Sequence, residues 1–265
     1  MIYTDEQIEA YLKGIFLGRI DTYNLPEDLY LATARYLEEA LYKGYGGTLA
    51  EFGGKDLELL KELKDNIWMF SAAKTYSQVR DAQEILEDLS NKISESPTFN
   101  DFKKAVMPSY EDYNVNWLES EYNTAKAQAS NAIAWQNIQK EKELFPWVVY
   151  SAVEDENTSE ICLELNGLTL PVDDPMWDTC APENHFNCRC ILEQIDKDED
   201  VNVTPQDEVD DIKSFVDEIQ QPEFAMNPGK DGYIFSDKHS YFEVAKGDKE
   251  LARNNFGLPL SGEDE

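Results

Sequence analysis

The stretch HFNCRC, residues 185–190, decides how the smaller part of this chain folds. It places two of the four cysteines and one of the two histidines within six residues. The other cysteines, Cys162 and Cys180, lie shortly before it, so all four fall within 29 residues and the rest of the chain has none. Such a concentration of soft ligands indicates either a metal site or thiols with a shared structural task.

The spacing within this stretch favours one shared site. Residues two apart in a strand point to the same side, so Cys188 and Cys190 can present both sulfurs to one point while Arg189 faces away. His185 can reach that point from the preceding turn, and Cys162 can arrive from another element. Three sulfurs and one imidazole are ligands that tetrahedral zinc favours. We therefore predict a zinc site whose ligands are Cys162, His185, Cys188 and Cys190. Cys180 is then not a ligand.

Two other states of the cysteines stay open at this point. The spacing is not that of common zinc fingers, whose paired cysteines lie two residues apart, and disulfides are the main rival. A bridge between Cys188 and Cys190 would be strained, which leaves pairings to Cys162 and Cys180. Four unligated buried thiols are the third state. Reduced thiols are the rule in the cytosol, which favours the metal site.

A catalytic use of the metal needs an open coordination position and a nearby base, for which Asp155 and Glu183 are the candidates. The predicted set offers four or five protein ligands and is closed. A module this small has little core of its own, so metal binding would supply folding energy. We therefore predict a structural site and no catalytic residue, with a zinc-dependent hydrolase or nuclease-type effector as the alternative function.

The charge of the chain restricts its partners. Its 265 residues include 54 acidic and 23 basic residues, a formal net charge of −31. Binding to nucleic acid or an anionic membrane requires basic patches, so neither is favoured, and basic proteins or cations fit better. The acidic N-terminus does not resemble a signal peptide, and no apolar stretch reaches membrane-spanning length. We therefore expect a protein made and kept in the cytosol.

The pattern along the chain predicts an α+β protein in three parts. Residues 1–145 form a helical region, residues 146–195 a small β-rich, zinc-stapled Cys/His module, and residues 196–265 an acidic linker and C-terminal extension. Apolar spacing predicts helices over five stretches: one carrying Ile8, Tyr11, Leu12, Ile15 and Phe16; one from Pro26 to Gly44–Gly47; one from Gly54 toward Leu89; a short one opened by residues 96–102; and one over 116–142.

The second half of the chain differs from the first in amino-acid composition. WVVYSAV (147–153) and CRCILEQI (188–195) have the composition of strands, and LNGLTL (165–170) contains a turn-forming Asn-Gly pair. Residues 193–223 hold 12 acidic and two basic side chains, which indicates a flexible spacer in preference to a thin helix around 209–219. Turns flanked by short strands are expected near 227–232, and His239 is expected at the surface. Four aromatic residues can anchor the end of the chain on its own core or on a neighbouring subunit: Tyr233, Phe235, Tyr241 and Phe242.

Residues 117–192 resemble a known family, the phage Mu F-like head morphogenesis proteins, also called minor head proteins. The resemblance rests on the alanine-rich run WLESEYNTAKAQASNAIAW (117–135), Tyr150, LNG (165–167), DDPMW (173–177) and HFNCRC. The chain has Ala181 where the family often has the first of two prolines, and Cys180 is extra. Position by position, the family pattern falls on Asp155, Cys162, Gly167, Pro182, His185, Cys188 and Cys190.

This resemblance implies a non-enzymatic minor head protein of a tailed phage or prophage. Such a protein acts in head morphogenesis near the portal, through contacts with portal, scaffold or major capsid protein. It is made in the host bacterial cytoplasm and located in the virion. A metal-stapled adaptor unrelated to phage is a third hypothesis. Some relatives carry a toxin or nuclease domain after this module, but the roughly 40 residues beyond the acidic stretch are few for a catalytic domain.

Overall fold

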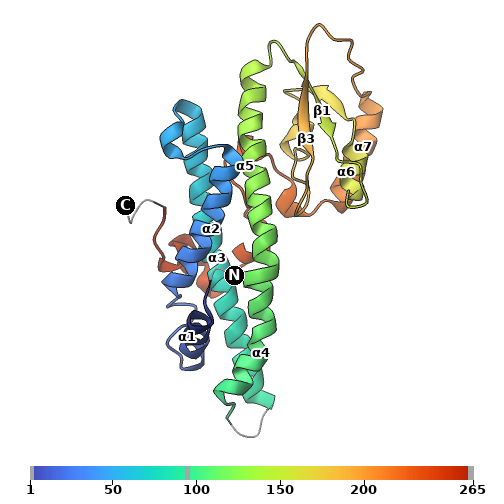
Figure 1. Ribbon diagram of the computed structural model, residues 1–265. Helices are drawn as coiled ribbons and strands as arrows, with labels where there is room; N and C mark the ends of the chain where they lie inside the picture. The colour runs from blue at the N-terminus through green and yellow to red at the C-terminus, as the bar shows by residue number, and fades with distance from the viewer. Residues whose placement is uncertain (1–2, 93–95, 262–265) are drawn as a thin grey trace. The chain divides into compact units, whose positions relative to one another are not determined.

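The computed structural model describes residues 3–92 and 96–261, which fold mostly into helices with one small sheet (Figure 1). The helices in the described residues are α1 (Asp5–Phe16), α2 (Glu27–Tyr45), α3 (Gly54–Lys92), α4 (Phe99–Glu111), α5 (Trp117–Glu141), α6 (Glu160–Leu165), α7 (Gln206–Ile219), α8 (Pro228–Asp231) and α9 (Lys249–Arg253). The strands are β1 (Trp147–Ser151), β2 (Thr169–Pro171) and β3 (Ile191–Ile195). This combination confirms the α+β class.

The described chain divides into two compact units. The helical unit takes residues 3–39, 64–92, 96–122 and 240–261, and the cysteine unit takes residues 40–63 and 123–239. The division at residues 145 and 195 was argued from sequence texture and stays a prediction. Among the described helices, none is long and apolar enough to cross a membrane.

Capping residues mark the starts of two helices of the helical unit. Thr4 and Gln7 form a capping box at the start of α1, and Thr98 and Asp101 form another at the start of α4. One turn of π-helix, Asp112–Asn116, links α4 to α5, so the two run as one helical stretch. The apolar stripe of α1 packs into a core with residues of α2, α3 and α4; from α1 it contributes Ile8, Tyr11, Leu12 and Ile15.

A buried ion pair lies inside the helical unit. Lys74 of α3 pairs with Glu121 of α5, and both side chains are almost fully buried. The hydroxyl of Tyr241, from the C-terminal segment, donates to Glu121 Oε1 at 2.9 Å, and its ring lies 5.3 Å from that of Phe70. The end of the chain is therefore anchored on its own core, which is one of the two arrangements expected from its aromatic residues.

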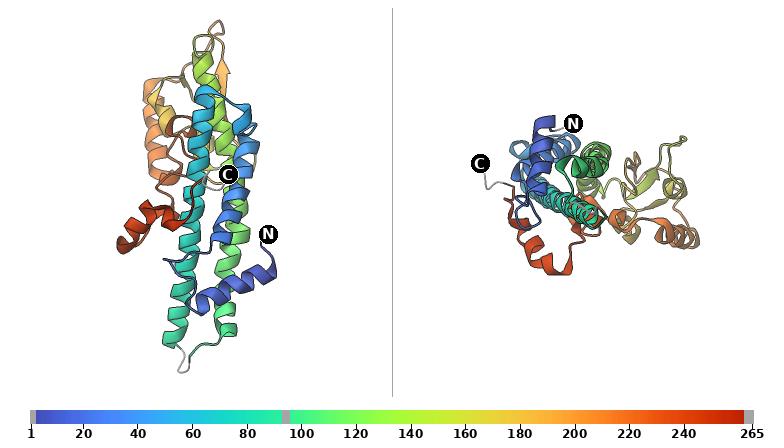
Figure 2. Two further views of the ribbon diagram at one scale, coloured as in Figure 1. Left: turned by 90° about the vertical axis from the view of Figure 1, so that its left-hand side faces the viewer. Right: turned by 90° about the horizontal axis from the view of Figure 1, so that it is seen from below.

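The cysteine unit is built around the three-stranded antiparallel sheet, with strand order β2-β1-β3. In β1, Val148 and Tyr150 are buried and their neighbours are half-buried, which is the alternation of a strand and confirms the strand predicted here from composition. The sheet shares one core with the apolar residues of α6 and α7, and Figures 1 and 2 show these two helices beside the strands. The core also contains Trp177 and all four cysteines.

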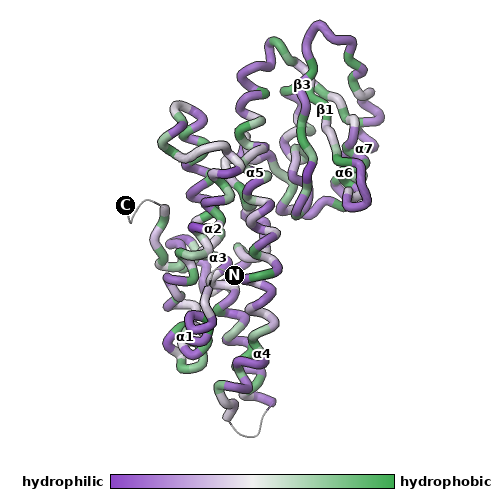
Figure 3. The backbone as a smooth tube through the Cα atoms, in the orientation of Figure 1, coloured by the Kyte–Doolittle hydropathy of each residue, from purple (hydrophilic) through white to green (hydrophobic). Residues whose placement is uncertain are grey.

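Three expectations about the chain after β3 are wrong. Residues 206–219 are no spacer, because Val209, Ile212 and Val216 fall on one face of α7 and are buried in the core with the cysteines. The loop before α7 is hydrophilic and coloured purple in Figure 3, and the acidic residues of α7 lie among its exposed positions. Residues 228–231 form the short helix α8 in place of turns, since Pro228 follows an Asn227 N-cap, and no strand flanks it among the described residues. His239 is buried and packs edge-on against Phe235.

Candidate metal centre

Three cysteines converge at one point of the cysteine unit. The sulfurs of Cys162, Cys188 and Cys190 all lie within 4.8 Å of one another, and all three residues are buried. Cys162 Sγ lies 3.6 Å from Cys188 Sγ and 3.3 Å from Nε2 of His185. The structure therefore brings the three predicted cysteine ligands together and places His185 beside Cys162, while the role of all four residues as ligands stays a prediction.

Each of these residues is positioned by a local feature of the chain. Cys162 lies in the first turn of α6, where its backbone N–H donates to the N-cap side chain of Ser159. Cys188 and Cys190 precede β3, so their expected place within a strand is wrong. Asn187 has a φ of 60°, and this left-handed turn brings the two cysteines back toward His185 before the ladder with β1 begins at Ile191.

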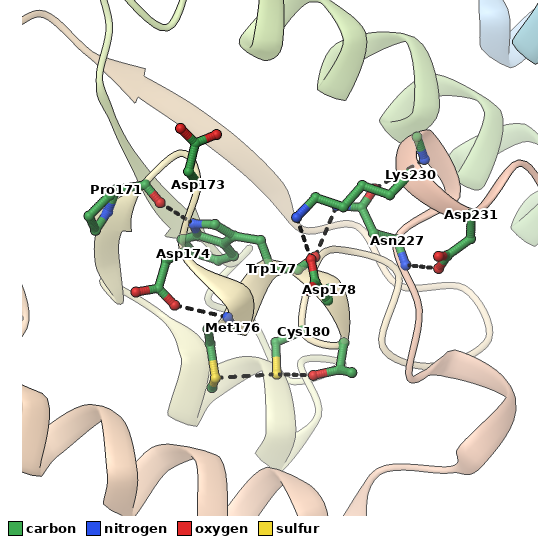
Figure 4. Close-up of polar contacts among 12 residues, drawn as sticks. Pro171, Asp173, Asp174, Met176, Trp177, Asp178, Cys180, Asn227, Lys230 and Asp231 are labelled. Carbon is green, nitrogen blue, oxygen red and sulfur yellow. Dashed lines mark hydrogen bonds and ion pairs between the residues drawn. The ribbon is translucent and has the colours of Figure 1, made fainter.

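The fourth cysteine lies outside the cluster, as expected for the thiol left over. Cys180 Sγ contacts Met176 Sδ at 3.8 Å and Thr179 Oγ1 at 3.6 Å, within the turn drawn in Figure 4. The surrounding turn is held by Trp177, whose indole N–H donates to the Pro171 carbonyl at 2.9 Å. All four cysteines are free thiols in the structure.

The distances fit the dimensions of a tetrahedral zinc site. With Zn–S bonds of about 2.3 Å and Zn–N bonds of about 2.0–2.1 Å, two sulfurs are expected about 3.8 Å apart, and a sulfur and a nitrogen about 3.6 Å apart. The measured 3.6 Å between Cys162 and Cys188 and 3.3 Å between Cys162 and His185 come within about 0.3 Å of these values. The donor set therefore fits a soft divalent cation such as zinc.

The tautomer of His185 fits the same role. Its Nδ1 lies 2.9 Å from the backbone carbonyl of Phe186, which can only accept a hydrogen bond. Nδ1 therefore carries a hydrogen, and Nε2 is the nitrogen directed at Cys162. A carbonyl that fixes the ring in this way is a common partner of metal-ligating histidines.

The pKa values within the metal-free cluster reflect these short contacts. Hydrogen bonding to Cys162 raises the pKa of His185 to about 11. Hydrogen bonding to Cys162 also lowers the pKa of Cys188 and raises the pKa of Cys190. A thiolate and an imidazolium therefore lie side by side, and a divalent cation would take the place of their shared protons.

A chain of hydrogen bonds extends from the cluster into the core. The Tyr150 hydroxyl lies 3.5 Å from Cys162 Sγ and accepts from Asn184 Nδ2 at 3.0 Å, which leaves its own hydrogen for the sulfur. Gln220, at the end of α7, donates to Asn184 Oδ1 at 2.6 Å. The sequence reasoning assigned no role to Asn184 or Gln220, because no spacing rule places an amide 22 or more residues away beside Cys162.

The two residues considered as catalytic bases have other surroundings. Asp155 forms a bidentate ion pair with Arg189, with distances of 2.7 and 2.8 Å, and this pair lowers the pKa of Asp155 to about 2. Burial raises the pKa of Glu183 well above its usual range, and its carboxyl oxygen Oε2 has no hydrogen-bond partner.

Comparison with known proteins matches the same part of the chain. Residues 83–193 match the family described as Phage Mu protein F like protein. The Mu-like prophage FluMu F protein of Haemophilus influenzae is 32% identical over 78 residues, which are 29% of this chain and 19% of that protein. The chain therefore aligns with less than a fifth of this relative. No solved structure gives a significant match.

The match of residues 83–193 to the phage Mu F-like family confirms the resemblance drawn from its motifs. The matched segment contains Cys162, His185, Cys188 and Cys190, together with α5, β1, α6 and β2.

Proposed function

We propose that this protein is a non-enzymatic minor head protein of a tailed phage or prophage that acts in head morphogenesis. The observation that carries the proposal is the match of residues 83–193 to the Mu F-like family, a segment in which three cysteines converge and His185 lies beside Cys162. The partners are other head proteins, with portal, scaffold and major capsid protein as the candidates. The protein is made in the host cytoplasm and is located in the virion.

The cluster acts in this proposal as a structural zinc site held by Cys162, His185, Cys188 and Cys190. When bound, zinc would join α6, the turn at 185–190 and the start of β3, which come from separate parts of the sequence. Four protein ligands fill a tetrahedral site and leave no position for a reacting water. The bidentate pair between Asp155 and Arg189 also argues against the hydrolase alternative, because it withdraws one of the two candidate bases.

The head assignment is tested in particles of the phage or induced prophage that encodes the chain. Purified heads, tails and complete virions are separated, and the protein is quantified in each fraction by mass spectrometry. The proposal predicts the protein in heads and virions, and heads that fail to mature when its gene is deleted. Normal heads from the deletion strain, or protein found only in the soluble lysate, would contradict the proposal.

The closed site is tested by cobalt substitution of the purified protein. A tetrahedral Co²⁺ site with three thiolates is expected to absorb strongly in the visible range, and added azide or cyanide should leave the spectrum unchanged. A spectrum that shifts on adding these small anions would indicate an open coordination position. That result would favour the zinc-dependent hydrolase over the structural site.

A further inference from the structure

Two adjoining cavities of the cysteine unit form one groove. The first has a volume of about 490 Å³ and the second about 210 Å³, and both are lined by Ser130 and Asn131 of α5 and by Ile191 of β3. We name this the α5–β3 groove. Its two ends differ in character: Glu183 and Asn187 line the larger cavity, whereas Trp135, Pro182 and Leu192 line the smaller.

The groove follows the outer edge of β3. The strand order β2-β1-β3 leaves β3 with one partner among the described strands. Ile191 and Leu192 are consecutive, so their side chains point to opposite faces of the sheet, yet both line the smaller cavity. A cavity in contact with both faces must lie along the strand edge. Edge strands offer backbone groups that can pair with an added extended segment.

A buried carboxyl group lines the wider end of this groove. Glu183 is 1% exposed, and its Oε2 has no hydrogen-bond partner. A buried acceptor left in this state is destabilising, and a donor placed in the groove would remove that penalty.

The net charge of the chain and the unpaired oxygen of Glu183 favour a basic side chain as that donor. Arg189 is neutralised by its bidentate pair with Asp155, and Lys43 and Lys126 are exposed side chains. Glu183 is the buried acid of the lining, and a cation placed beside it would favour its ionised form. The net charge of −31 also attracts cationic partners over long range.

We infer that the α5–β3 groove binds an extended segment of a partner protein, which pairs with the edge of β3 and places a lysine or arginine against Glu183. Apolar side chains of the segment would occupy the smaller cavity beside Trp135 and Leu192. The half-exposed Ile191, at 50%, lies where the two cavities meet. This inference rests on the proposed function for the identity of the partner, a head protein.

The test uses three pools of fluorescein-labelled nonapeptides with Lys, Glu or Ala fixed at the central position and Val, Thr and Ser mixed elsewhere. Binding to the full-length protein is measured by fluorescence anisotropy. The variants are Glu183→Gln, which keeps the size of the side chain, and Ile191→Asp, which alters an exposed residue. Glu164→Gln, an exposed acid on α6 outside the groove, is the matched control. Thermal unfolding of each variant establishes that it is folded.

We expect the Lys pool to bind at least tenfold more tightly than the Glu pool. That preference should fall below threefold in Glu183→Gln, remain in Glu164→Gln, and binding should be lost in Ile191→Asp. Hydrogen exchange of the backbone amides at 191–195 should slow at least threefold on binding. Equal binding of the Lys and Glu pools, no binding of any pool, or unchanged exchange at 191–195 would overturn the inference. The peptide experiment does not test whether the protein is located in heads. Failure of the proposed function would be seen only in the fractionation of phage particles, so the two failures can be told apart.

Discussion

The burial of α7 predicts that Val216→Ala destabilises the cysteine unit. Val216 is fully buried in the core that holds the four cysteines. The substitution removes two methyl groups, each contributing about 0.8 kcal/mol through burial, and leaves a cavity. With the cavity contribution we expect the free energy of unfolding to fall by about 2–3 kcal/mol.

Ile219→Ala is the matched control on the same helix. Ile219 is 41% exposed, so its truncation removes little buried surface and should lower the free energy of unfolding by less than about 1 kcal/mol. Both variants are compared with the unaltered protein by equilibrium urea unfolding, followed by tryptophan fluorescence, with Trp177 and Trp135 in the affected core. Equal effects of the two substitutions, or a loss below about 0.5 kcal/mol for Val216→Ala, would refute the packing of α7 on this core.

Three further predictions concern buried polar groups. Tyr150→Phe removes the hydroxyl beside Cys162 and should weaken metal affinity about tenfold or more, measured by competition with a chelator. Lys74→Met leaves Glu121 buried without its partner and should lower the free energy of unfolding by about 3–5 kcal/mol, whereas adding Glu121→Leu should recover most of it. Metal binding near pH 7 should release protons, because the raised pKa of His185 keeps it protonated in the metal-free protein, and affinity should therefore fall as the pH is lowered.

For each of these predictions, one result would contradict it. Unchanged chelator competition in Tyr150→Phe would show that its hydroxyl does not support the ligand sulfur. A double variant at Lys74 and Glu121 no more stable than Lys74→Met would show that the loss comes from packing rather than from the unpaired charge. The proton release is measured by calorimetry in two buffers of different ionisation enthalpy, and equal heats in both would contradict a protonated His185.

The long helices were predictable because their signals are local. The stripe of α1 and the small residues of α5 repeat at helical spacing, and capping residues such as Thr98 lie directly before the first turn. The β-branched and aromatic composition of residues 147–153 identified β1 in the same way. These patterns depend only on which side chains share one face, which the sequence states directly.

Residues 206–219 were wrongly predicted to be a spacer because the prediction relied on their acidic composition and not on the helical spacing of their apolar residues. The many acidic side chains of 193–223 suggested a solvated spacer, but three apolar residues at helical spacing are enough to bury one face, and the acids occupy the other. His239 was misplaced for a different reason, because its burial depends on Phe186 and Phe235 and not on its sequence neighbours. Tertiary contacts of this kind leave no periodic signal.

The residues of the candidate metal centre could be selected from the sequence, but the hydrogen bonds that surround them could not. Ligand chemistry and spacing selected the four residues before any geometry was known, since few other residues of the chain offer sulfur or imidazole. The chain of hydrogen bonds through Tyr150, Asn184 and Gln220 was not predicted. Amides occur throughout the sequence, and only the folded arrangement shows which of them lie beside the cluster.

The central claim, that three cysteines and one histidine hold a single structural zinc, is tested most directly by native mass spectrometry of the freshly purified protein. We predict one zinc per chain in the unaltered protein and in Cys180→Ser, whose sulfur lies outside the cluster, and loss of the zinc in Cys188→Ser. A protein without metal and with blocked thiols, or a Cys180→Ser variant that loses zinc as readily as Cys188→Ser, would contradict the account.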